Sequence, residues 1–361
     1  MKRILGLLAC LVVAFSVTPA EAWGPKLEVD EDTWIQLGLL GQFQVESAQL
    51  SEDEWTFDIF TRRARIMGLG SVHEKVRFFF STDVPNTGKT GAPNDIVWND
   101  GFVDFQLMPE LKIAFGRILV PFSPENQASA AAILGIDYNL NLLKLPTFMD
   151  RAFWRDDGFE LRGVLVDGLI EYRGGVFRGM RDMDANPGYH PRAIGMVMVN
   201  FADAQPGWFY NPNSLGSLEV LSVGGGVDYI ANSAEDVDAS VAWNAFAKVE
   251  QPVGGGVVNA LLAYYDWSGP RPWAGDFEGQ TIGAQVGFLL PGEIMTGRLQ
   301  PVVRYQRQDP DEGQSLDTIN VGLNYYLKGQ AINFKADYAF NDRRVGGERV
   351  DAFRFQTQLV F

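Results

Sequence analysis

The last eleven residues of the chain, 351–361, read DAFRFQTQLVF and alternate between apolar and polar side chains. The odd positions are mainly large and apolar and the even positions mainly polar: Phe353, Phe355, Thr357, Leu359 and Phe361 against Ala352, Arg354, Gln356, Gln358 and Val360. A period of two places these sets on opposite faces of a β-strand. Because about 9 to 11 residues cross a bilayer at the usual strand tilt, we predict a membrane-spanning strand. The alternative is an edge strand of a soluble sandwich.

Residues 1–22 have the features of a secretory signal peptide, which is removed from the mature protein. A basic pair precedes an apolar run over 4–15, and Ala-Glu-Ala at 20–22 fits a cleavage site. Cys10 lies in the middle of the apolar run, which disfavours its use as a lipid-modified cysteine. It is the chain's one cysteine, so the predicted mature chain has neither disulfides nor thiol chemistry.

The composition restricts the class of protein. Removing the two basic residues and the one acidic residue of the signal peptide leaves 28 basic and 44 acidic residues, a formal charge of −16. This balance disfavours a nucleic-acid partner. After the signal peptide no stretch approaches 18 consecutive apolar residues, so helical membrane spans are not expected. The 39 glycines and 12% aromatic residues favour an all-β chain.

Two-faced segments continue through the chain. A short acidic segment at 23–33 is predicted to lie in the periplasm, followed by one barrel domain over 34–361. We predict sixteen antiparallel strands, near 34–46, 55–69, 75–83, 97–107, 111–120, 152–165, 168–178, 192–201, 217–230, 236–251, 257–266, 280–290, 294–307, 316–327, 331–340 and 351–361. An even number of strands suits a closed transmembrane barrel.

The connections alternate between short turns and long polar loops, as in barrels with a turn rim and a loop rim. Short connections follow even-numbered strands and long loops follow odd-numbered ones, which predicts both chain ends on the periplasmic rim. Two connections break the pattern: 202–216 is long where a short turn is expected, and 231–235 is short where a loop is expected.

Several segments of the chain resemble the phosphate-selective porin O and P family. They are FTRRAR (60–65), DGFVDF (100–105), GRILVPFSPE (116–125), RDDGFELRG (155–163), EYRGGVFRG (171–179), QPVVRY (300–305), GLNYYL (322–327) and the terminal Phe361. The resemblance implies a sixteen-stranded outer-membrane barrel, commonly trimeric, that passes small solutes and is handled by the outer-membrane assembly machinery through Phe361. The family's archetypes guide phosphate with arginines and lysines, whereas this chain is strongly acidic.

Such porins commonly fold a long third loop inward to narrow the pore. Here the third loop is the longest, at 121–151. We therefore expect it to fold inward, with an Ala-rich helical turn near 127–134, and to carry constriction residues Glu125, Asp137, Lys144 and Arg151. The alternative is that these four are ordinary exposed charges.

Alternation also assigns charged residues to the lumen. The pore-lining candidates are Arg63, Arg65, Arg77, Arg162, Arg304, Lys335, Arg354, Asp236 and Asp238. We predict a basic stripe of Arg63, Arg65 and Arg77 opposite the two aspartates, which would orient dipolar or anionic solutes. A structural salt-bridge role for Arg63 and Arg65 is the alternative. Arg62 is predicted to face away from the lumen.

The sequence carries no motif for catalysis. Its two histidines, His73 and His190, lie in predicted connections outside any motif, and metal-binding and phosphate-cradling patterns are absent. We therefore predict a passive porin without cofactor or metal, in contact with outer-membrane lipid and with small ions or solutes. The alternatives are a structural or adhesive barrel and a barrel enzyme.

Overall fold

The computed structural model describes residues 24–51, 53–145, 154–179, 191–231, 239–271, 274, 276–345 and 348–361. The predicted signal peptide and the candidates Arg151, Asp236 and Asp238 lie outside these residues. Across the described ranges the regular secondary structure is entirely β, without an α-helix. None of the described residues belongs to a helix long and apolar enough to cross a membrane.

Seventeen strands are described, and sixteen of them match the predicted ones in order. Their bounds are β1 Lys26–Glu28, β2 Trp34–Gln49, β3 Trp55–His73, β4 Val76–Asp83, β5 Val97–Met108, β6 Leu111–Leu119, β7 Arg155–Leu165, β8 Ile170–Phe177, β9 Arg192–Asn200, β10 Val220–Ile230, β11 Ser240–Val253, β12 Gly256–Ser268, β13 Gly279–Leu289, β14 Arg298–Pro310, β15 Leu316–Lys328, β16 Ile332–Val345 and β17 Glu348–Val360. The additional strand, β1, pairs with the first residues of β2.

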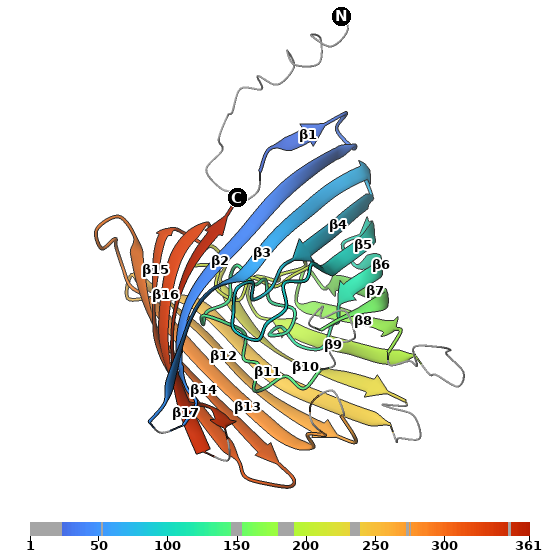
Figure 1. Cartoon of the computed structure of the whole chain (residues 1–361). Coiled ribbons are helices and arrows are strands. Elements are labelled where there is room, and N and C mark those ends of the chain that lie inside the picture. The colour runs from blue at the N-terminus through green and yellow to red at the C-terminus, as the bar shows by residue number, and fades with distance from the viewer. Residues whose placement is uncertain are drawn as a thin grey trace, which may run out of the picture.

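Strands β2 to β17 form one closed antiparallel barrel (Figure 1). Each strand pairs with its neighbour in sequence, and the ring closes where β17 pairs with β2, from Ala352 opposite Ala48 to Val360 opposite Leu40. Beyond the last residue of β17, the Phe361 amide and carbonyl exchange hydrogen bonds with Leu39, at 3.0 and 2.6 Å. Closure removes the unpaired edges that a sheet would expose in lipid.

The last strand has the predicted phase. Phe353, Phe355 and Leu359 are exposed on the outer wall, while Gln356 and Gln358 are fully buried inside. Most other strands of the ring also place large apolar side chains on the outer face, for example Leu39, Phe115, Val197, Leu262 and Val321. A continuous apolar outer surface on this scale fits a lipid environment.

The two rims differ as predicted, except that β16 and β17 extend over most of the predicted loop 341–350. We call the rim that carries Phe361 the terminal rim and the opposite one the distal rim. Most terminal-rim connections are tight, such as Gly254–Gly255, whose φ values of 58° and 81° match the left-handed pair of a type I′ hairpin turn. The longest is the connection 201–219, and the structure explains its length, because this segment enters the barrel.

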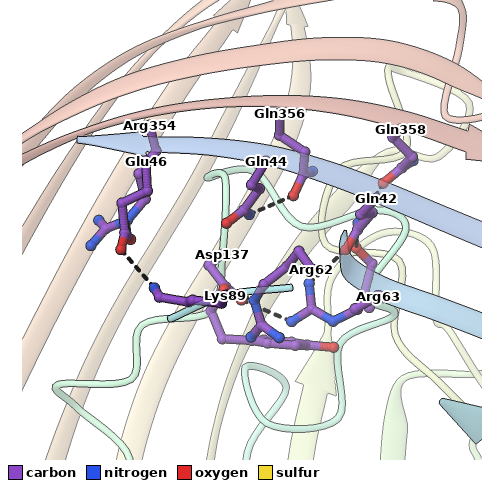
Figure 2. A network of polar contacts seen from close by, with 12 residues as sticks. Gln42, Gln44, Glu46, Arg62, Arg63, Lys89, Asp137, Arg354, Gln356 and Gln358 are labelled. Atoms are coloured by element: carbon purple, nitrogen blue, oxygen red, sulfur yellow. Dashed lines mark hydrogen bonds and ion pairs between the residues drawn. The ribbon is translucent and has the colours of Figure 1, made fainter. Parts of the chain in front are cut away.

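Polar pairs fasten the closing seam from the inside (Figure 2). Gln42 donates to Gln358 and Gln44 donates to Gln356, each at 2.7 Å. One step further towards the distal rim, Arg354 donates to Glu46 at 2.8 Å. The two residues of each pair lie directly opposite each other in the pairing of β2 with β17. A one-residue slip would turn every one of them towards lipid, so they fix the seam register.

Candidate functional site: a filled lumen with a charged vestibule

The third loop folds into the barrel, as predicted. Its described part, 120–145, is called the long loop here, and Figure 1 shows it in teal and green inside the strand wall. Val120, Phe122 and Leu142 are fully buried. The Ala-rich stretch forms turns and an isolated bridge instead of a helix. Polar and apolar contacts fix the loop to strands on several sides of the barrel.

The main polar attachment is Asp137, which accepts from Arg62 at 2.6 Å and from Arg63 at 2.8 Å (Figure 2). Burial by itself raises the pKa of a carboxyl group, but the two guanidinium groups overcome this effect and hold the pKa of Asp137 well below its usual range. Asp137 therefore stays ionised, and charge-assisted hydrogen bonds hold the middle of the long loop against β3.

The inward position of Arg62 contradicts the predicted outward one. The register of β2 against β3 shifts between Gln42 and Phe43: Gln42 lies opposite Arg63, and Phe43 lies opposite Thr61. Arg62 is thus the extra residue of a β-bulge, which breaks the alternation locally. The bulge directs two consecutive arginines into the lumen, and strict alternation allows only one.

Further hydrogen bonds to loop carbonyls come from the strands around the seam. Lys335 donates to the Gly135 carbonyl at 3.1 Å and also to that of Ile133. Arg304 donates to the Asp137 carbonyl at 2.9 Å. Gln42, Gln358 and Asn324 donate to the carbonyls of Ala130, Ala131 and Leu134 at 2.8 to 3.1 Å. The loop backbone is therefore satisfied by lumen side chains in place of water.

Glycines on the inner wall make room for the apolar part of the loop. A Cβ added to Gly283 would lie 2.1 Å from Leu142 Cδ1, and one added to Gly287 would lie 2.7 Å from Leu134 Cδ1. Leu142 and Leu134 are buried. The two glycines on β13 thus act as sockets, because any larger side chain would push the loop away.

We expect Gly283→Val to lower stability by about 1 to 3 kcal/mol through overpacking. Leu142→Ala should cost about 2 to 5 kcal/mol through the cavity it leaves. The double variant should cost clearly less than the sum, because each change relieves the other. The measurement is the temperature at which the folded band is lost on semi-native gels, and strict additivity would show that the socket contact is absent.

The lumen is not polar throughout, although the alternation in the last strand predicts a polar inner face there. Strands β4, β5 and β9 contribute apolar side chains to the interior: Phe79, Phe102, Ile194, Met196 and Met198 are buried in one cluster with loop residues. The sequence of β9, RAIGMVMVN, is apolar on both faces, which is the signal for a strand covered on both sides. This half of the barrel interior is packed like a protein core.

A second inward segment completes the filling. The connection 201–219 between β9 and β10, called the crossbar here, has Tyr210 fully buried inside the barrel. Tyr210 exchanges backbone hydrogen bonds with the long loop, donating to Gln127 at 3.0 Å and accepting from Ser129 at 2.8 Å. Trp208 packs on Phe79 and Phe102, with ring centroids 5.5 and 5.3 Å apart. The sequence pattern assigns no role to this segment.

Open space remains near the seam, on the distal side. A cavity of about 320 Å³, called the vestibule here, lies between the long loop and the inner wall of β2, β3 and β14 to β17. Its charged lining consists of five basic and four acidic side chains: Arg62, Lys89, Arg304, Arg343 and Arg354, with Glu46, Asp137, Asp337 and Asp342. Two more cations, Arg63 and Lys335, hold the adjoining loop.

The other pore-lining candidates on the wall lie in separate ion pairs. Arg65 pairs with Asp83 at 2.8 Å, and Arg162 pairs with Asp104 at 2.7 Å. Arg77 is exposed near the terminal rim. The structure therefore brings Arg304 and Arg354 together at the vestibule but leaves Arg65, Arg77 and Arg162 outside its lining. The stripe hypothesis itself stays a prediction.

The described constriction candidates have distinct surroundings. Glu125 is buried and accepts from the Tyr265 hydroxyl at 2.9 Å and from Asn139; burial raises its pKa. Lys144 donates to Gln308 at 2.6 Å, and burial lowers its pKa to about 8. All three described candidates contact the inner wall, so none is an ordinary exposed charge.

Sequence reasoning missed part of the vestibule. Lys89 comes from the second loop and reaches Glu46 at 2.6 Å, and Asp342 accepts from Arg354 at 2.7 Å. Lys89 lies in a loop, which has no alternation to read, and Asp342 lies in β16 at a register shift between Ala339 and Arg343, where the alternation is interrupted. Among the described residues, no group of three or more His, Cys, Asp or Glu side chains is placed to hold a metal ion.

No protein-family model matches the chain, and no curated protein matches it. Solved structures do match. OmpF of Salmonella typhi in complex with daunomycin is 12% identical with a TM-score of 0.61, over 93% of this chain and 100% of that one. The anion-selective porin from Comamonas acidovorans is 14% identical with a TM-score of 0.57, over 91% and 100%.

The outer-membrane channel DcaP of Acinetobacter baumannii gives a TM-score of 0.56 at 12% identity, over 94% of this chain and 99% of that one. At such identities the likeness concerns the fold. The chain therefore has the fold of outer-membrane porins, a closed sixteen-stranded antiparallel barrel with an inward third loop.

Proposed function

We propose that this chain is an outer-membrane porin through which small ions and solutes diffuse passively, with a preference for anions. The vestibule carries the proposal. Basic side chains outnumber acidic ones in its lining although the whole chain has a formal charge of −15. A narrow space between low-dielectric walls focuses such a local surplus, whereas charges on the loops are screened by salt.

The apolar outer wall and the porin fold support placement in the outer membrane, after removal of a signal peptide. The resemblance of the sequence motifs to phosphate-selective porins supports phosphate as a candidate solute and a homotrimer as the assembly. Phe361 closes the seam with its backbone while its side chain is exposed. That exposure supports its recognition by the assembly machinery.

We expect the double variant Lys89→Gln/Arg343→Gln to move the reversal potential in a tenfold KCl gradient towards cations. Both side chains line the vestibule, so the change removes two positive charges there. Arg349→Gln is the matched control, since Arg349 is exposed on the same distal rim and outside the vestibule lining. An equal shift in the control and the double variant, or none in either, would refute the vestibule as the selective element.

A second candidate function is a structural or adhesive barrel with a closed lumen. It is favoured by the two inward segments, which together fill much of the described interior. Single-channel recording of the purified protein separates the two functions, because a plugged structural barrel shows no unitary steps at any voltage that the bilayer withstands.

A further inference from the structure

The crossbar is fixed at widely separated points of the ring. Near β4 and β5 the Trp208 indole donates to Asp104 at 2.8 Å. On the far side, Asn213 donates to Gln300 on β14 at 3.0 Å and to the Tyr326 hydroxyl on β15 at 2.7 Å. In a ring of sixteen strands these anchors lie nearly opposite each other. The segment therefore spans the interior on the side of the terminal rim.

Buried charges hold the crossbar between its ends. Arg173 donates to the carbonyls of Gly207 at 2.9 Å and Gln205 at 3.1 Å. Glu250 accepts from the amides of Ser214 at 2.9 Å and Gly216 at 2.8 Å. A connection serving only as a turn needs no such attachment, as the two-residue turns on the same rim show.

Between the crossbar and the long loop a small cavity of about 30 Å³ remains against β11 to β13. Asp137 and Tyr138 line both this cavity and the vestibule. The two spaces are therefore adjacent, on either side of these residues. The volume of this cavity holds about two water molecules or one small anion.

Lys248 on β11 is the basic side chain that lines the cavity. It is 7% exposed, and its Nζ has no hydrogen-bond partner within the described structure. The ammonium lies over the Tyr210 ring, 4.5 Å from the centroid. An ammonium has three donors and no acceptor, and a buried one without a partner is costly.

The carboxylates that line or adjoin this cavity are bound to other groups. Glu250 accepts from the crossbar and from Asn259. Glu171 accepts from Arg173 and from the Tyr210 hydroxyl with Oε1, its Oε2 makes no hydrogen bond to Lys248 or to any other described residue, and Glu125 accepts from Tyr265. The donors of Lys248 are thus left for a ligand in the cavity, and the ligand chemistry that matches them is a small inorganic anion.

We propose that the crossbar forms a second constriction of the channel, in which Lys248 binds a small inorganic anion between the crossbar and the long loop. The inference rests on the proposed porin function, because it requires that solutes pass through the lumen from one rim to the other. It adds a binding site on the terminal side of the vestibule and assigns a role to the longest connection on that rim.

The first test replaces Lys248 by Met and by Arg in the full chain and records single channels in chloride and in bromide. For Lys248→Met we expect a several-fold loss of anion over cation permeability and loss of the saturation of conductance with anion concentration. Lys248→Arg should retain both. Lys328→Met is the matched control, because Lys328 is an exposed lysine near the same rim. In crystals soaked in bromide, anomalous scattering should place the ion beside Lys248 in wild type and not in Lys248→Met.

The second test replaces residues 203–217 by a two-residue Asn-Gly turn, and in a separate variant changes Trp208 and Phe209 to Ala in case the shortened chain does not fold. Either variant should raise unitary conductance several-fold. The second constriction is overturned if both crossbar variants keep the wild-type conductance. It is also overturned if Lys248→Met keeps the wild-type selectivity and bromide does not bind beside Lys248 in wild type. Either result leaves the proposed porin function intact. If the wild-type protein does not conduct but the shortened variant does, the result contradicts a permanently open porin and supports the crossbar as a constriction. If neither the wild-type protein nor any variant conducts, both the porin function and the second constriction are overturned.

Discussion

Phe355→Arg is expected to abolish stable insertion of the barrel. Phe355 lies on the outer wall in the middle of β17, between Val45 on β2 and Ala336 on β16. An arginine at the bilayer midplane costs about 2 to 4 kcal/mol on a barrel wall, and here it would also weaken the strand that closes the ring. Loss of the heat-modifiable band and of membrane-extracted protein is the measurement.

The control for this variant is Gln356→Arg, one residue further on and on the inner face. Arg354 shows that the inner face of the same strand already holds a guanidinium group with acidic partners. We expect folding to persist with a smaller loss, because the change removes the hydrogen bond from Gln44. Equal tolerance of both variants would mean that the outer face of β17 does not contact lipid.

Asp137→Ala is the second variant with a large expected effect. Its side chain is the acceptor for Arg62 and Arg63, so its removal leaves two buried guanidinium groups without their carboxylate. Breaking a buried ion pair from one side costs about 3 to 5 kcal/mol. The long loop should also loosen from β3, which we expect to appear as a lower unfolding temperature and as added open-channel noise.

The same variant changes the charge of the vestibule, because Asp137 is one of its four acidic lining residues. The reversal potential should therefore move further towards anions. Asp309→Ala is the control: Asp309 pairs with Arg307 on the exposed surface, where solvent screens the pair and its removal should leave the unfolding temperature almost unchanged. If the two variants unfold at the same temperature, Asp137 does not anchor the loop.

The candidate site was predictable only in part. Lumen-facing Arg304, Lys335 and Arg354 follow from alternation, and the inward long loop with Asp137 follows from its length and from the porin resemblance. Arg62 was assigned to the wrong face, because a bulge depends on how two strands pair and leaves no mark in one strand's own pattern. Lys89 and the crossbar contacts lie in irregular segments, which have no period to read, and Asp342 lies at a register shift within β16.

What the sequence determined by itself is the wall of the barrel. A two-residue period fixes which face of a strand is apolar, and sixteen such strands with alternating short and long connections define a closed ring in the order of the chain. The tertiary structure decided what fills the ring: which arginines meet Asp137, where the crossbar lies, and that basic side chains outnumber acidic ones in the lining of the vestibule. The physical reason is the separation along the chain of the residues that interact. Strand patterning depends on neighbours in sequence, whereas the lumen is built from contacts between distant residues, such as Lys335 with Gly135, which form only in the closed barrel.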